Sequence, residues 1–137
     1  MEGVIFALLA WIGANSELDT DVVLPNVVFT TQHNMCALYG IDNKHTCDSA
    51  KLKGFYDKNV TVYLRSDFDA DDLSDQSRLL HELVHYAQWM NQSDQAYCLG
   101  HLELEAYALQ DKWRVAYGLE PSISEFKRIM LAASCDD

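Results

Sequence analysis

The sequence lacks the features of a nucleic-acid-binding or multidomain protein. It has only 10 Lys and Arg residues against 21 Asp and Glu, and the net charge of -11 argues against nucleic acid and anionic membrane surfaces as partners. No repeat and no low-complexity linker divides its 137 residues. We therefore expect a single domain over residues 1–137, long enough for a hydrophobic core.

The apolar segment at residues 4–14 lacks the properties of a membrane anchor or a signal peptide. Its eleven residues are too few to span a bilayer, and it follows Glu2 without any Lys or Arg. We expect it to form the first helix of the folded domain. Four apolar positions at helical spacing would face the core: Ile5, Leu8, Leu9 and Ile12.

A His-Glu-Leu-Val-His string at residues 81–85 has the spacing of a metal-binding helix. Residues four apart lie one turn above each other on an α-helix, so the rings of His81 and His85 can reach a single metal ion. Glu82 points about 100° round the helix, where it misses the metal but could act as a general base on a bound water. A catalytic zinc usually takes three protein ligands, so the pattern predicts a third ligand on another element.

Glu105 is the expected third ligand, on a second predicted helix from Gly100 to Tyr117. Nineteen residues lie between His85 and Glu105. This spacing, with the sequence Glu-Ala-Tyr-Ala at residues 105–108, resembles the gluzincins, the thermolysin-like and aminopeptidase-like zinc peptidases. In that family a Glu within a Glu-small-hydrophobic pattern follows HExxH at this distance.

The resemblance covers roughly residues 60–117, and the short chain is most similar to the reduced members called minigluzincins. It implies an α+β, zincin-like domain, in which a small antiparallel or mixed sheet packs on helices that include the HExxH helix and the Glu helix. The alternating segment Val60 to Leu64 would be the edge strand that binds an extended peptide. Leu109 stands where thermolysin-like proteins have an Asp that supports a zinc-bound His. The candidates for that support are Gln88, His101, Glu103 and Gln110.

These residues predict zinc-dependent hydrolysis of peptide or protein substrates, with one Zn2+ per chain. Zinc held by His81, His85 and Glu105 would polarise the scissile carbonyl, and Glu82 would transfer the proton. Three further side chains are candidates for a role near the metal or the oxyanion: His101, Tyr107 and Tyr117. The alternative is a noncatalytic zinc-stabilised or peptide-binding domain derived from a peptidase.

Four cysteines, Cys36, Cys47, Cys98 and Cys135, include no CxxC pair. The pattern favours two disulfides in an exported protein, periplasmic or extracellular, over four free thiols in the cytosol. A short connection should make the last two predicted helices antiparallel and bring Cys135 near Cys98. Cys36 and Cys47 would then form a local bridge.

Hydrophobic patterning predicts the remaining elements. The expected elements are a strand at 22–30, a short helix at 33–39, a loop at 41–50, a hairpin of residues 51–56 and 60–64, and helices at 73–90, 100–117 and 122–133. The last helix places four apolar residues on one face: Ile123, Phe126, Ile129 and Met130. The Asp-rich loop before residue 73 fits helix capping better than calcium, because the EF-hand spacing fails at Asp72 and Arg78.

Overall fold

The computed structural model describes residues 1–49, 54–57 and 60–135, which form an α+β fold. The predicted α+β class and the two helices predicted at 73–90 and 100–117 are confirmed. None of the described helices is long and apolar enough to cross a membrane. The elements in chain order are α1 (Glu2–Asn15), β1 (Asn26–Thr30), α2 (Gln32–Leu38), α3 (Lys44–Ser49), β2 (Gly54–Asp57), β3 (Thr61–Arg65), α4 (Leu73–Met90), the 3-10 turn η1 (Ser93–Gln95), α5 (Leu99–Ala116) and α6 (Glu125–Ala133).

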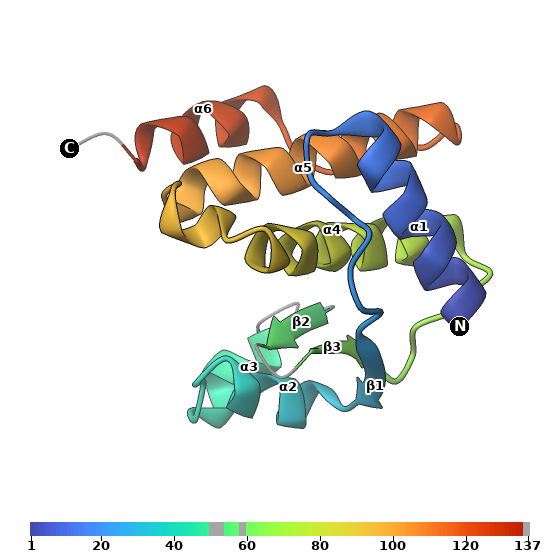
Figure 1. Cartoon of the computed structure of the whole chain (residues 1–137). Coiled ribbons are helices and arrows are strands. Elements are labelled where there is room, and N and C mark those ends of the chain that lie inside the picture. Colours follow the sequence, from blue (N-terminus) through green and yellow to red (C-terminus); the bar gives the residue numbers. More distant parts are fainter. Residues whose placement is uncertain (50–53, 58–59, 136–137) are drawn as a thin grey trace.

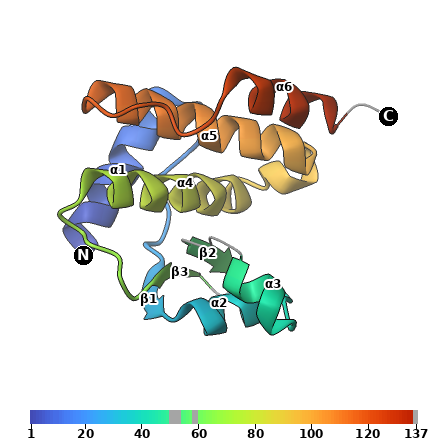
Figure 2. The same cartoon turned by 180° about the vertical axis from the view of Figure 1, so that it is seen from behind.

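The elements are stacked in layers. Figure 1 shows α6 on α5, α5 on α4, and α4 on the sheet, with α2 and α3 below the sheet. Figure 2 shows the same order from behind, with α1 packed against α4. The helix that carries the HExxH string therefore lies between α5 and the sheet.

α4 is capped at its start and held by a broad apolar face. The Asp72 side chain accepts a hydrogen bond from the backbone N–H of Asp75 at 3.0 Å, which satisfies one of the free amides of the first turn. The apolar side chains of α4 pack with α1, β3 and α5 in one hydrophobic core, so this helix is held by neighbours on several sides. Four of them have no solvent exposure: Leu79, Leu80, Leu83 and Val84.

α1 contributes to this core as predicted. Its four predicted core residues are all buried: Ile5, Leu8, Leu9 and Ile12. The loop that follows is fastened to the end of α4 by the side-chain amide of Asn91, which accepts from Asp19 N–H at 2.9 Å and donates to the Asp19 carbonyl at 2.8 Å. Burial and hydrogen bonding together join α1 and its loop to α4.

The three described strands have the order β1-β3-β2, with β1 parallel and β2 antiparallel to β3. The prediction that residues 60–64 form an edge strand is wrong, because β3 pairs on both sides and its Val62 and Leu64 are fully buried. β2 is the edge strand next to α4. Strand order depends on long-range pairing, which alternation within one strand does not encode. Parts of the predicted hairpin, residues 51–53 and 58–59, lie outside the described residues.

Three other predicted elements differ in extent from the structure. The helix expected at 122–133 begins at Glu125, after its Ser124 cap, so Ile123 lies before it. The strand expected at 22–30 begins only after Pro25, and the loop expected at 41–50 contains α3. Pro cannot donate a ladder hydrogen bond, which explains the late start of β1.

α6 is attached to α5 through a buried carboxylate. Asp111 accepts hydrogen bonds from the backbone N–H and the hydroxyl of Ser122, both at 2.6 Å, and it pairs with Arg128 at 2.8 Å. The amphipathic pattern of α6 identifies an apolar face but does not say what covers it. Three residues of that face are each more than half exposed: Phe126, Ile129 and Met130.

Both predicted disulfides are present. Cys36–Cys47 joins α2 to α3, and Cys98–Cys135 joins the start of α5 to the chain just beyond α6. Gly100 permits close approach of the two helices, since a Cβ there would lie 2.5 Å from the carbonyl oxygen of residue 131 and 2.8 Å from the Cys135 sulfur. α6 is thus held to α5 near both of its ends.

Candidate metal centre

His81, His85 and Glu103 converge between α4 and α5. The Nε2 atoms of the two histidines are 3.1 Å apart, and Oε1 of Glu103 is 3.4 Å from Nε2 of His81 and pairs with Nε2 of His85. All three ligand atoms lie within 4.8 Å of one another. We call these three residues the ligand group.

Two of the three spacings in the ligand group suit a tetrahedral zinc ion, whereas the third pair, His85 and Glu103, lies closer together than two zinc ligands would. Two ligands bound at 2.0–2.1 Å in tetrahedral geometry lie about 3.3 Å apart. The 3.1 Å between His81 and His85 and the 3.4 Å between His81 and Glu103 fall on either side of this value. Two imidazoles and one carboxylate leave one position open, as catalytic zinc sites do. The donor set can therefore hold a divalent ion.

Glu105, the predicted third ligand, is not part of the ligand group. Its Oε1 accepts a hydrogen bond from Nε2 of Gln88 at 2.9 Å. Residues two apart on an α-helix are rotated by about 200°, so Glu103 and Glu105 leave α5 in nearly opposite directions. In the structure Glu103, and not Glu105, lies beside the two histidines. Counting residues does not determine how the loop after Asn91 rotates α5 relative to α4.

Two buried glutamines contact the histidine rings on the side away from the ligand group. Oε1 of Gln88 is 2.8 Å from Nδ1 of His85, and Oε1 of Gln110 is 3.0 Å from Nδ1 of His81. The orientation of Gln88 is fixed, because its Nε2 donates to a backbone carbonyl and to the Glu105 carboxylate, both at 2.9 Å, and both groups only accept. Each neutral imidazole then carries its proton on Nδ1 and directs its Nε2 lone pair at the ligand group. Both glutamines are among the predicted supporting residues.

Glu82 follows His81 on α4 and is partly shielded from solvent. Burial raises the pKa of its carboxyl, and the charges of His81 and His85 only partly oppose that rise. A carboxyl with a raised pKa exchanges protons more readily near neutral pH than an ordinary one. This property suits a general base.

His85 and Glu103 shift each other's pKa in opposite directions. Burial lowers the pKa of His85, but its hydrogen bond with Glu103 and the charge of Glu82 outweigh burial, and the net shift is upward. Burial raises the pKa of Glu103, but hydrogen bonds with His81 and His85 outweigh burial and hold that pKa far below its ordinary value. The carboxylate is thus ionised, as a metal ligand must be, whereas His85 must be neutral to bind.

Of the other predicted site residues, only Tyr107 contacts the ligand group. Its ring centre is 4.5 Å from that of His81. Tyr117 stands about 15 Å further along the helix axis and stacks on Trp113, with ring centres 4.4 Å apart. His101 is exposed and lies beside the Cys98–Cys135 bridge, outside the ligand group.

Tyr39, which follows α2, interacts electrostatically with the site, and the sequence did not indicate this. Burial raises its pKa, and the negative charges of Glu82 and Glu103 raise it further. Its phenol is thus within electrostatic reach of the candidate base and of one candidate ligand, and it stays protonated at neutral pH. No local motif marks this residue, because only the fold brings the end of α2 towards α4 and α5.

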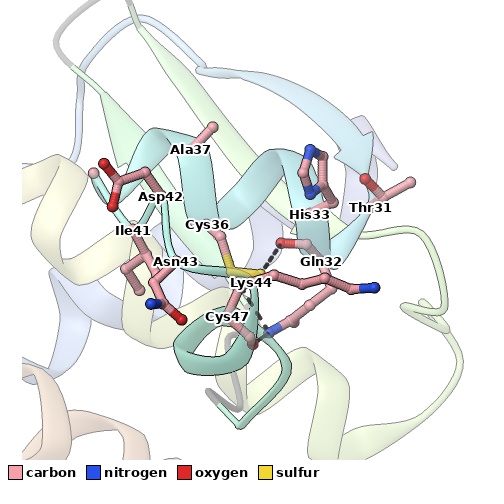
Figure 3. A pocket seen from close by; sticks show the side chains of 11 residues that line it. Thr31, Gln32, His33, Cys36, Ala37, Ile41, Asp42, Asn43, Lys44 and Cys47 are labelled. Carbon is pink, nitrogen blue, oxygen red and sulfur yellow. Dashed lines mark hydrogen bonds between the residues drawn. A yellow bond between two sulfur atoms is a disulfide. The ribbon is translucent and has the colours of Figure 1, made fainter.

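A pocket of about 820 Å³ lies in the lobe formed by α2 and α3 (Figure 3). His33, Lys44 and the Cys36–Cys47 disulfide contribute to its walls. No residue of the ligand group lines it, so this pocket is separate from the candidate metal centre.

The acidic residues before α4 make local hydrogen bonds. Oδ2 of Asp75 accepts from the Asp69 N–H, and Oδ1 of Asp69 accepts from the Asp71 N–H, both at 2.9 Å. With Asp72 as the cap of α4, these contacts agree with the predicted role in capping.

The fold and the ligand group together define a small α+β protein with a candidate metal centre on an HExxH helix. A family model described as Domain of unknown function (DUF6647) matches residues 1–137. The chain belongs to this family. Neither a curated protein nor a solved structure matched the chain.

Proposed function

We propose that the protein is a zinc-dependent peptidase with a zincin-like active site. The observation that carries this proposal is the convergence of His81, His85 and Glu103 beside the carboxyl of Glu82. Hydrolysis by a metal-activated water requires such a set, namely three ligands, an open position and a base outside the ligands. The HExxH helix packed on a mixed sheet, with an edge strand beside it, further supports the zincin-like assignment.

In the proposed reaction the protein's own groups orient the site and move one proton. When bound by the ligand group, zinc would supply Lewis acidity towards a carbonyl oxygen and a water molecule. Glu82 would accept a proton from the attacking water and later donate it to the leaving amine, and its raised pKa suits both transfers. The phenol of Tyr39 is a candidate to donate to the carbonyl oxygen as it becomes negative.

The proposed location is outside the cytosol. Two disulfides form and persist in oxidising compartments and are rare in the cytosol. A periplasmic or extracellular site would also give access to peptide or protein substrates.

The test compares wild type with Glu82→Gln, using metal content by mass spectrometry and digestion of an unbiased peptide library. We expect one zinc per chain in both proteins, and a rate about a hundredfold lower or worse in the variant because the base is lost. Glu17→Gln is the matched control, since it removes an exposed carboxylate outside the site. If zinc-loaded wild type cleaves no peptide, the peptidase proposal fails, and a noncatalytic zinc-stabilised or peptide-binding domain takes its place.

A further inference from the structure

A lysine next to the metal centre occupies a position that helix stability does not explain. Lys127 lies in the first turn of α6, where its backbone N–H donates to the Ser124 cap at 3.1 Å. A positive charge at this end of a helix opposes the helix dipole. Its ammonium is 3.2 Å from the Tyr107 hydroxyl and 4.7 Å from the ring centre. Within the described ranges, no carboxylate pairs with Lys127.

Tyr107 connects this lysine to the ligand group, because its ring also contacts the ring of His81, with 4.5 Å between the ring centres. The second cation of α6, Arg128, is committed to the buried Asp111 at 2.8 Å. Together with the Cys98–Cys135 disulfide, that pair holds α6 rigidly on α5. Lys127 thus contacts a tyrosine that adjoins the ligand group, and its own side chain is exposed to solvent.

We propose that Lys127 and Tyr107 form a carboxylate-binding subsite, so that preferred substrates carry a carboxylate close to the scissile bond. This substrate class rests on the proposed peptidase function. An ammonium and a phenolic O–H are two donors side by side, which suits the two acceptor oxygens of a carboxylate. That carboxylate can be a free C-terminus or the side chain of an acidic residue.

The net charge of the protein favours the opposite substrate class, so the two expectations can be distinguished by experiment. A net charge of -11 favours cationic substrates at long range. Salt screens that field over about 8 to 10 Å, whereas a carboxylate in the subsite would contact Lys127 directly. The local pair should therefore decide the preference once a substrate is bound.

The experiment measures binding of N-acetylated alanine pentapeptides with a central Glu, Gln or Lys, each as the C-terminal acid or amide. Zinc-loaded Glu82→Gln protein is titrated calorimetrically, alone and combined with Lys127→Met, Lys127→Arg or Lys112→Met. Lys112 is an exposed lysine on α5 and supplies the matched charge control. Comparing Glu with Gln, and acid with amide, separates the two sources of the carboxylate.

We expect at least one carboxylate peptide to bind more tightly than its neutral partner. Lys127→Met should reduce that selectivity about three- to tenfold, a modest change because the ammonium is exposed and screened. Lys127→Arg and Lys112→Met should preserve it. Three outcomes overturn the proposal. The first is that the carboxylate peptides do not bind, or bind no more tightly than their neutral partners. The second is a carboxylate preference that is unchanged in Lys127→Met, and the third is equal weakening of all peptides in that variant, which would mean that Lys127 only positions Tyr107. Carboxylate-selective binding without cleavage by wild type would refute the peptidase proposal alone.

Discussion

Replacing Glu103 or Glu105 by Ala distinguishes the metal centre in the structure from the one expected from sequence. Both variants remove one negative charge from the same helix, so net charge and helix composition stay matched. The two side chains differ in what they contact. Glu103 reaches the histidine Nε2 atoms, and Glu105 reaches the amide of Gln88.

The expected losses of zinc affinity differ widely. Structural zinc sites bind with about 10 to 16 kcal/mol over four ligands, which is about 2.5 to 4 kcal/mol for each ligand. Glu103→Ala should therefore raise the zinc Kd about a hundredfold to a thousandfold. Glu105→Ala should raise it about tenfold or less, since Gln88 keeps its hydrogen bond to the residue 102 carbonyl at 2.9 Å and so keeps its orientation towards His85.

Competition titrations of zinc against a chromophoric chelator, run at one fixed pH for both variants, measure both constants. Circular dichroism and thermal unfolding check that each metal-free variant is folded. The opposite ranking, with zinc lost from Glu105→Ala and kept by Glu103→Ala, would refute the corrected ligand set. Equal, small losses in both variants would mean that neither carboxylate is a ligand.

Three further predictions concern the groups that hold the site in place. Gln110→Leu should weaken zinc binding about tenfold to a hundredfold, because Nδ1 of His81 loses its acceptor; unchanged affinity in the same titration would show that Gln110 does not orient the ring. Gly100→Ala should lower the free energy of unfolding by about 1 to 3 kcal/mol in urea titrations, because the new Cβ meets the residue 131 carbonyl oxygen and Cys135. Gly3→Ala, with nothing within 4 Å, is its control, and equal effects in the two would contradict this packing. Replacing Cys135 by Ser should cost about 3 to 4 kcal/mol of stability, as expected for a bridge across a sequence separation of 37; a Cys47–Cys98 fragment in non-reducing peptide maps would contradict the pairing.

The fold could be predicted where a feature is local to one element. α1 illustrates this, since the helical spacing of its four apolar residues identified the side chains that are buried. The pairing of Cys98 with Cys135 followed from a short connection between two helices, which leaves few arrangements. In contrast, the position of β3 in the middle of the sheet depends on partners that lie before it in the chain, β1 and β2.

The same distinction between local features and features that depend on other elements applies to the residues of the candidate site. His81, Glu82 and His85 sit on one helix, so the geometry of that helix determines their mutual arrangement. Tyr39 and Lys127 reach the site from α2 and α6, and no spacing within α4 or α5 could have indicated them. A usable signal did exist for Glu103, because it shares a helical stripe with Gln110 seven residues later, and both face α4.

The corrected site gives Glu105 a different connection to the metal centre. Its carboxylate accepts from Gln88, and Oε1 of the same amide faces Nδ1 of His85, so the three groups form a continuous hydrogen-bonded chain. The negative charge of Glu105 favours the orientation of the Gln88 amide in which its oxygen accepts from Nδ1–H of His85. This hydrogen bond makes the Nε2 lone pair of His85 a stronger donor to a metal ion. Glu103 and Glu105 then act on the same histidine from opposite sides, the first through Nε2 and the second through Nδ1. Two carboxylates spaced two apart on α5 are thus both connected to His85, Glu103 directly and Glu105 through Gln88.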